Sequence, residues 1–327
     1  MSRIENYCFS ANRICHHDDY HLLISKFVAV KNEKGFVNKI KILFSSSTIF
    51  YLDIDSVDLF FFPLIILRSL WKGKGCALSV RTEYLLENRT FKEFFFRRGR
   101  LIFLKALVKK IIFLAIKFFS STTVVSIHKG HPLMHKMEPF VNGFIYDPQL
   151  WDLEFLDIRQ CRPIEIDEIF FNETQNIVLV AGRLNEQRSK KELLKYLENN
   201  SKYFFLLAGS IEDEDAVIIK NFDNCLMLNK FLTNEELLYL IANCDITYCF
   251  YNNDRPSGFF GRALQLNKPI IVRKNAFLDL VFLDYNKKIA VGKLEELEDI
   301  SIENFDIQEK ENYYKDVNNF KQIIFNL

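Results

Sequence analysis

Residues 254–272 read DRPSGFFGRALQLNKPIIV. This stretch predicts a short loop, a helix that begins at Ser257 and Gly258, a turn, and a buried strand that starts at Ile270. The first turn of a helix leaves backbone N–H groups without helical partners at the positive end of the helix dipole. Small residues there leave room for a diphosphate. An ordinary strand-turn-helix-strand unit, with Ser257 as a simple N-cap, is the alternative.

Length and charge narrow the choice of partner. A chain of 327 residues with 49% hydrophobic residues suggests about two domains. Residues 1–150 carry 22 Lys and Arg and 12 Asp and Glu, whereas residues 151–327 carry 21 Lys and Arg and 30 Asp and Glu. We therefore expect the first half to face an anionic partner. No zinc-finger spacing and no ribonucleoprotein motif occur, so we expect a membrane surface and no nucleic acid.

Residues 91–119, FKEFFFRRGRLIFLKALVKKIIFLAIKFF, have the most unusual composition, with eight basic residues and one Glu. They predict an amphipathic helix that lays apolar side chains into a headgroup region and basic ones on anionic lipid. A helix packed on its own domain, with solvated lysines, is the alternative. No apolar run approaches the roughly 18 residues of a membrane span. Seven cysteines without a C-x-x-C and without a signal peptide predict reduced thiols in the cytoplasm.

The first half alternates expected strands with helices, which predicts a parallel sheet. We expect strands near residues 4–10, 46–53, 77–83, 123–127 and 140–151, and a strand that leads into a helix at 58–67. Ligands gather at the carboxyl ends of such strands, where Glu83 and His128 would lie. A structural ion pair for Glu83 and an ordinary loop histidine are the alternatives. The segment CHHDDYH at 15–21 lacks a second pair of metal ligands, and we expect a polar loop there.

The second half shows a complete second alternation from residue 177 onward. Gly182, Gly209 and the Ser257–Gly258 pair each follow an expected strand, so they share one edge of the sheet and favour a nucleotide. Thr233 and Glu236 predict a capping box at the start of a helix. The predicted fold class is α/β, with two Rossmann-like doubly wound domains that face each other across a cleft. The boundaries are 1–150 and 151–327, and the last helix is expected to return to the N-terminal domain.

Residues 142–285 resemble the nucleotide-sugar-binding domain of GT-B glycosyltransferases. They are most similar to the family-4 retaining group of bacterial surface-polysaccharide enzymes. A strand ends in Gly-Arg-Leu at 182–184, and a second Arg, Arg188, follows five positions after Arg183. The segments LLAG at Gly209, EELLYLIANCDITY with Asp245, and RALQLNKPII follow in the order of the family.

The resemblance implies transfer of a sugar from a nucleotide-diphosphate donor to an acceptor hydroxyl, without a metal or other cofactor. It implies that the donor is bound by Gly182, Arg183, Arg188, Gly209, Ser257 and Gly258. The family has two glutamates separated by seven residues, and Asp254 and Arg262 take these positions here. Asp254 would orient the donor sugar. Arg262 cannot accept the ribose hydroxyl bonds that a Glu accepts, and we expect it on phosphate instead. Glu83 and His128 are the candidates for activating the acceptor.

The basic Phe-rich segment and the family together suggest a lipid-linked glycan acceptor in lipopolysaccharide, O-antigen or capsule synthesis. The protein is then expected at the inner face of the cytoplasmic membrane. Two alternatives stay open. One is a nucleotide-sugar 2-epimerase of the same fold. The other is a catalytically silent GT-B protein that binds a membrane enzyme, since the glutamate pair is missing.

Overall fold

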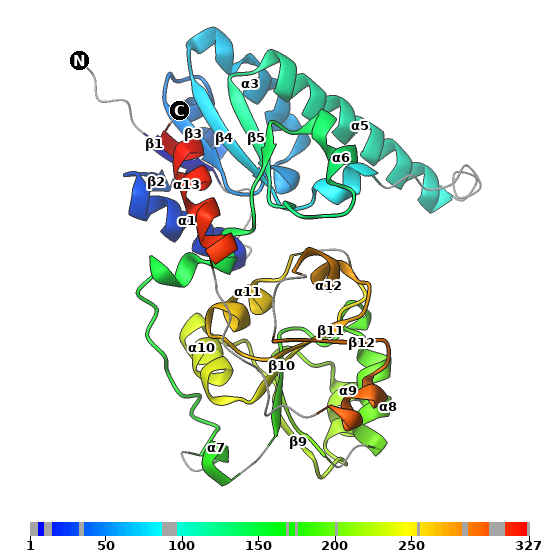
Figure 1. Ribbon diagram of the computed structural model, residues 1–327. Helices are drawn as coiled ribbons and strands as arrows, with labels where there is room; N and C mark the ends of the chain where they lie inside the picture. The colour runs from blue at the N-terminus through cyan, green and yellow to red at the C-terminus, as the bar shows by residue number, and fades with distance from the viewer. Residues whose placement is uncertain are drawn as a thin grey trace. The chain divides into compact units, whose positions relative to one another are not determined.

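A computed structural model of the chain describes residues 6–9, 15–32, 36–86, 97–167, 170–173, 176–199, 202–253, 256–282, 287–300 and 311–325. The chain forms two compact units, each built on its own sheet (Figure 1). The first unit comprises Met1–Pro148 and Asn312–Leu327, and the second comprises Gln149–Glu311. The C-terminal helix therefore belongs to the first unit. That the domains face each other across a cleft stays a prediction.

The first unit contains a six-stranded sheet in the order β2-β1-β3-β4-β5-β6, and every pair of neighbouring strands is parallel. The strands are β1 Asn6–Phe9, β2 Lys31–Asn32, β3 Thr48–Tyr51, β4 Lys74–Ser79, β5 Thr122–Ser126 and β6 Gly143–Phe144. The helices are α1 Cys15–Phe27, α2 Phe36–Leu43, α3 Phe62–Leu67, α5 Arg97–Phe119, α6 Met134–Met137 and α13 Glu311–Phe325. In Figure 1, α3 and α5 cover one face of the sheet, and α1 and α13 lie on the other side.

One hydrophobic core joins the sheet to α2, α3 and α5. Leu43 of α2, Ile65 of α3 and Phe113 of α5 are buried in the same cluster as Ile49 of β3 and Val124 of β5. These three helices therefore lie on one side of the sheet. Such coverage explains why β3 and β4 consist almost entirely of buried side chains, as in parallel sheets with helices on both faces.

Two expectations for the first half were wrong. Residues 58–67 contain no strand, because they form the 3-10 helix η2 Leu59–Phe61 and then α3, where Pro63 lies at the helix start, the position that tolerates it. The segment 15–21 is not a loop but the beginning of α1. The chain runs from this segment directly into Leu23 and Ile24, which are buried in the first unit, so the helix is held by packing that the segment alone does not indicate.

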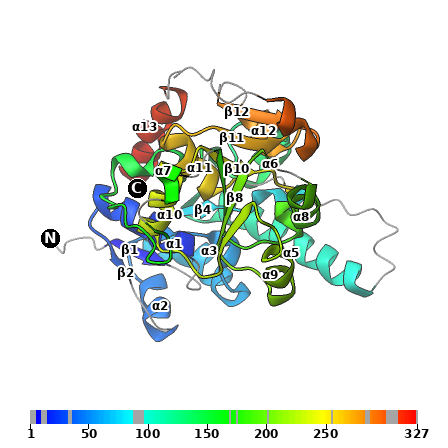
Figure 2. The ribbon, with the colours of Figure 1, turned by 90° about the horizontal axis from the view of Figure 1, so that it is seen from below.

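The second unit contains the parallel sheet β12-β11-β10-β7-β8-β9. Its strands are β7 Ile177–Ala181, β8 Phe204–Ala208, β9 Cys225–Leu228, β10 Ile246–Cys249, β11 Ile270–Arg273 and β12 Lys288–Val291. Its helices are α7 Phe170–Glu173, α8 Lys190–Asn199, α9 Asp213–Ile219, α10 Asn234–Asn243, α11 Gly258–Gln265 and α12 Phe277–Val281. Figures 1 and 2 show α8 and α9 together on one side of this sheet and α10 and α11 on the other.

This arrangement confirms the predicted class of two doubly wound α/β domains. The capping box at α10 is also confirmed: Thr233 Oγ1 accepts from Glu236 N, and Glu236 Oε2 accepts from Thr233 N. In the described part of the chain, no helix combines the length and the apolar composition that crossing a bilayer requires.

Candidate functional site

The loops that follow β7 and β8 meet at the carboxyl edge of the second sheet. Gly182 N donates to Ala208 O at 2.8 Å, and both Gly182 and Gly209 have positive φ, at 98° and 144°. A Cβ atom on Gly209 would lie 2.2 Å from Gly182 O. Only glycine permits these two backbones to approach so closely. The edge therefore presents main chain at the place where the sequence predicted it.

Arg188 lies against the first of these loops. It ends the 3-10 helix η8 Glu186–Arg188, whose N-cap Asn185 accepts from Arg188 N. The Arg188 guanidinium donates to Ala181 O, and its carbon lies 5.1 Å from the centroid of the Tyr251 ring. A Cβ on Gly182 would be 2.7 Å from Arg188 Nη2. The side chain is thus fixed at the end of β7 by a carbonyl and an aromatic ring.

Arg183 and Lys190 bring two further cations to this edge, and Lys190 was missed by the sequence analysis. The Arg183 side chain is 68% exposed and lies 3.7 Å from Glu212 Oε1. Lys190 Nζ lies 2.8 Å from Asp215 Oδ2, and this hydrogen bond is the main cause of its raised pKa. The Arg183 side chain is therefore largely in solvent, while Asp215 holds Lys190 at the start of α8.

The helix of the opening sequence, α11, begins as predicted. Ser257 is its N-cap and its side chain accepts from Phe260 N at 3.3 Å. A Cβ on Gly258 would lie 2.3 Å from Gln149 Oε1, so glycine leaves room for that side chain. Burial raises the pKa of Tyr251, whereas Arg188 and Ser257 lower it. Tyr251 therefore lies within reach of both the η8 turn and the start of α11.

Arg262 lies elsewhere. Its Nη2 atom is 2.8 Å from Asp152 Oδ2, and the two side chains are 4% and 2% exposed. Gln265 Nε2 donates to Asp152 Oδ1 at 3.0 Å and to Gln149 O at 2.7 Å. Arg262 thus binds the segment before the second sheet onto α11, and we leave it out of the donor-binding group.

Two predicted site residues cannot be placed. Asp254 lies outside the described residues. Glu83 belongs to the 3-10 helix η4 Thr82–Leu86, but its side chain lies outside the described part of the structure. Their roles stay predictions.

The carboxyl edge of the first sheet carries a buried chain of hydrogen bonds that the sequence analysis did not predict. Asp55 Oδ2 accepts from Ser79 Oγ at 2.9 Å, and Ser79 Oγ lies 2.7 Å from Thr82 Oγ1. Thr82 Oγ1 donates to Ser126 Oγ at 2.8 Å. Lys109 Nζ of α5 lies 3.2 Å from Asp55 Oδ1. The available signal was a polar residue at the end of each of two parallel strands, Ser79 in β4 and Ser126 in β5.

His128 ends this chain. Its Nδ1 atom lies 3.1 Å from Ser126 Oγ, and its ring centroid is 5.7 Å from that of His131. The side chain is fully buried. His128 is therefore held at the carboxyl edge, as predicted, but inside the protein.

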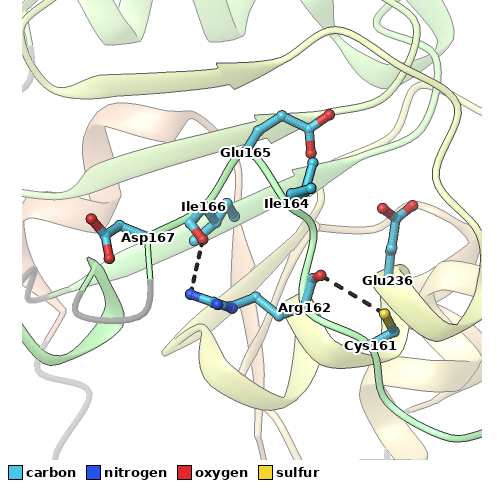
Figure 3. Close-up of a pocket in the computed structure, with 7 residues that line it drawn as sticks. All are labelled: Cys161, Arg162, Ile164, Glu165, Ile166, Asp167 and Glu236. Carbon is cyan, nitrogen blue, oxygen red and sulfur yellow. Dashed lines mark hydrogen bonds between the residues drawn. The ribbon is translucent and has the colours of Figure 1, made fainter.

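A separate pocket of about 690 Å³ lies between residues 161–167 and α10 (Figure 3). Arg162 Nη1 donates to Ile166 O at 3.3 Å across it. Three of the residues that line it are the carboxylates Glu165, Asp167 and Glu236. Lys230 Nζ lies 2.7 Å from both Glu165 and Glu236. Since this pocket is acidic and none of its lining residues comes from the loops after β7, β8 or β10, it is a poor place for a diphosphate.

Comparisons with known proteins find solved structures of similar fold. No protein-family model and no curated protein matches the chain. The structure of Anabaena HepE in complex with UDP and glucose has a TM-score of 0.56 at 13% identity, covering 98% of this chain and 92% of that one. The structure of WaaG, a glycosyltransferase involved in lipopolysaccharide biosynthesis, has a TM-score of 0.55 at 11% identity, with coverages of 98% and 99%. A UDP-forming trehalose-phosphate synthase from Burkholderia xenovorans has a TM-score of 0.51 at 10% identity, with coverages of 94% and 81%.

Proposed function

We propose that this chain, which has the two-domain GT-B fold, is a glycosyltransferase that moves a sugar from a nucleotide-diphosphate donor to a glycan acceptor. The observation that carries the proposal is the carboxyl edge of the second sheet. There two glycines of positive φ, the fixed guanidinium of Arg188 and the start of α11 follow the ends of β10, β7 and β8, which are neighbours in the sheet. Such an edge is the general ligand position of open parallel sheets.

Departure of the nucleotide diphosphate builds negative charge, and stabilising this charge is the main task of such a site. Arg188 is suited to it because its guanidinium is already ordered by Ala181 O and the Tyr251 ring, so little side-chain entropy is lost on binding. The exposed Arg183 would close on the outer phosphate. Gly182, Gly209, Ser257 and Gly258 would supply main-chain contacts. The likeness in fold to HepE, whose structure holds UDP, supports a nucleotide diphosphate as the kind of ligand.

On the acceptor side, we propose that Glu83 lies near the accepting hydroxyl and that Asp254 orients the donor sugar. His128 is fully buried, so we propose that it does not touch the acceptor but fixes, through Ser126 and Thr82, the segment that carries Glu83. Retention of configuration, a lipid-linked acceptor and contact of residues 91–119 with an anionic membrane belong to the same proposal. The exposed apolar side chains of α5, which are Leu107, Ile111, Phe118 and Phe119, support the membrane contact.

The test of the donor site is thermal unfolding with UDP, UDP-glucose and a panel of other nucleotide diphosphates. A ligand at about 100 times its dissociation constant stabilises the native state by roughly 2.7 kcal/mol. Arg188→Ala is expected to weaken binding at least about tenfold, because a hydrogen bond to a charged group contributes roughly 1.5–3 kcal/mol. Arg162→Ala, which removes an arginine from the acidic pocket, is the matched control and should bind as the native chain does.

Reaction assays separate the alternatives. Transfer to an added acceptor, or slow hydrolysis of the bound donor, supports the transferase. Inversion at C2 of the donor sugar identifies an epimerase. If the chain binds a nucleotide but turns over no donor, it is a catalytically silent partner protein. If it binds none of the nucleotides tested, the proposed donor site is ruled out.

A further inference from the structure

The helical layer over the first sheet is apolar on its outer side as well as on its inner side. Among the residues that the structure describes, eighteen large apolar side chains are exposed, and eleven of them lie in residues 36–44, 59–71 and 107–119. The first range contains α2 and Phe44. The second runs from η2 through α3 to the 3-10 helix η3 Arg68–Trp71, and the third is the C-terminal part of α5. Contiguous exposed apolar patches of this kind mark interaction surfaces.

Helix α5 shows the pattern most clearly. Phe113 and Ile116 are fully buried in the core of the first unit. Leu107, Ile111 and Phe118, which are 43%, 58% and 69% exposed, follow one another at spacings of four and seven residues. They therefore share the face of the helix that points away from Phe113. A surface helix that packs only on its own domain turns polar residues outward, whereas α5 turns Leu107, Ile111 and Phe118 outward within the part whose side chains are described, residues 107–119.

The other two segments continue this surface at the C-terminal end of α5. Ser69 Oγ of η3 donates to Phe119 O at 3.4 Å, which places η3 beside that end. Leu70 in η3 is 71% exposed. Phe44, next to α2, is also exposed, and its ring centroid lies 5.0 Å from that of Trp71. Figures 1 and 2 both show α3, which leads into η3, beside α5. We call Phe44, Leu70, Leu107, Ile111 and Phe118 the outer apolar face.

The buried Arg68 fixes these segments to one another. Its Nη1 donates to Ile42 O at 2.9 Å, and its Nη2 donates to Lys74 O at 3.1 Å. The end of α2 and the start of β4 are thereby held around η3. Arg68 therefore holds together the parts of the outer apolar face that lie in η3 and next to α2.

The charge of these segments is of one sign. Residues 36–52, 59–82 and 97–137 contain no Asp and no Glu. Lys72 and Lys74 are exposed beside η3, whereas Lys117, which precedes Phe118, is half-buried and donates to Glu138 O at 2.7 Å. A second copy of the chain in a symmetric contact would bring lysines against lysines. An anionic bilayer complements both the apolar side chains and the positive charge.

We infer that the outer apolar face is a docking surface for an anionic lipid bilayer, formed by α2, η3 and α5 together. The inference extends the membrane contact proposed for residues 91–119 to two further elements and fixes which side of the first unit meets the lipid. It does not require the transfer reaction.

The test is sedimentation of the purified full chain with sucrose-loaded vesicles, either phosphatidylcholine alone or phosphatidylcholine with phosphatidylglycerol. Two paired variants divide the face: Ile111→Ser with Phe118→Ser in α5, and Phe44→Ser with Leu70→Ser outside it. Each pair should weaken partitioning into the anionic vesicles at least about tenfold, because two apolar side chains no longer enter the interface. Lys72→Gln with Lys74→Gln should weaken it about fivefold for each charge, and only with anionic lipid.

The control pair, Val217→Ser with Phe231→Ser, removes exposed apolar side chains of the second unit and should partition as the native chain does. The inference is overturned if the native chain ignores anionic vesicles, if the Phe44 and Leu70 pair binds normally, or if the control pair loses as much. Light scattering tests the other possible partner, a second copy of the chain. If the native chain is an oligomer and the serine variants are monomers, the outer apolar face is a protein interface and the inference is overturned. A thermal shift with UDP, measured on every variant, reports separately on the donor site.

Discussion

At the scale of single residues, the donor edge depends on how little space the backbone leaves. Gly182 and Gly209 touch through main-chain atoms, and both have φ values that L side chains rarely adopt. Arg188 fills the space that a side chain on Gly182 would need. The glycines and the arginine therefore depend on one another, because the missing side chain of Gly182 provides the space that the guanidinium occupies.

Gly209→Ala should destabilise the protein by about 3 kcal/mol or more, since the new methyl group meets Gly182 O and the backbone is strained. Gly143→Ala is the control, because nothing lies within 4 Å of a Cβ at that position. Chemical denaturation of both variants measures the difference. Equal stability of the two would contradict the close approach of the β7 and β8 loops.

The ion pair of Arg262 and Asp152 gives a second prediction at this scale. Both side chains are buried, so removing either one leaves an uncompensated charge, which costs about 3–5 kcal/mol. Arg262→Met and Asp152→Ala should each destabilise the chain strongly. The double variant should be clearly more stable than the sum of the two losses predicts. Additive losses in denaturation would show that the pair contributes nothing as a pair.

At the scale of elements, α13 is attached to the first unit by packing and by one buried carboxylate. Val317, Phe320 and Ile324 are buried, and the Phe320 ring centroid lies 6.2 Å from that of Phe27 in α1. Asp316 is bonded to Lys129 Nζ and accepts from Asn319 Nδ2 at 2.8 Å. Helix α13 therefore returns to the first unit after the chain has completed the second one.

Asp316→Ala should lower the stability of the first unit by about 2 kcal/mol. This is less than the cost of breaking a fully buried ion pair, because Lys129 is partly exposed. Asn318→Ala, an exposed position of the same helix, should change it by less than about 0.5 kcal/mol. Scanning calorimetry, which resolves the two units if they unfold separately, is the measurement. An unchanged transition in Asp316→Ala would mean that packing alone holds α13.

At the scale of the whole molecule, buried thiols make stability depend on alkaline pH. Burial raises the pKa of Cys8, Cys76, Cys225, Cys244 and Cys249 to about 12. In the unfolded chain these thiols titrate near 8.5. Between those values the folded state retains protons that the unfolded state has lost. Their contribution to stability is therefore complete below about pH 8.5 and is lost as the pH rises toward 12.

The free energy of unfolding should fall above about pH 9, by about 1.4 kcal/mol per pH unit for each buried thiol. Urea titrations at pH 7.5, 9 and 10 measure the slope. Cys76→Ala should reduce that slope, whereas Cys161→Ala, an exposed thiol, should leave it unchanged. A free energy that stays constant up to pH 10 would show that the thiols are accessible to solvent.

The sequence by itself determined strands β7 to β11 of the second unit, the capping box of α10 and the edge on which the glycines lie. These features follow from local rules: apolar runs form buried strands, and the parallel connections bring strand ends to one side. The helix at 97–119 was equally predictable from its composition. Helix α9 and strand β12 were not predicted. The absence of a strand at 58–67 was not predictable, because short apolar runs do not separate strand from helix. The helical start at 15–21 was missed because this polar segment shows no apolar period of its own.

Only the tertiary structure decided which partners the individual side chains bind. Arg262 was expected on phosphate, but its buried partner Asp152 is 110 residues away in the chain, and no local pattern indicates such a pair. The hydrogen-bonded chain from Asp55 to His128 joins residues after three different strands. Whether the outward side of α5 is apolar could be settled only once its inward side was known. Periodicity fixes the elements, whereas contacts between distant residues depend on how those elements pack.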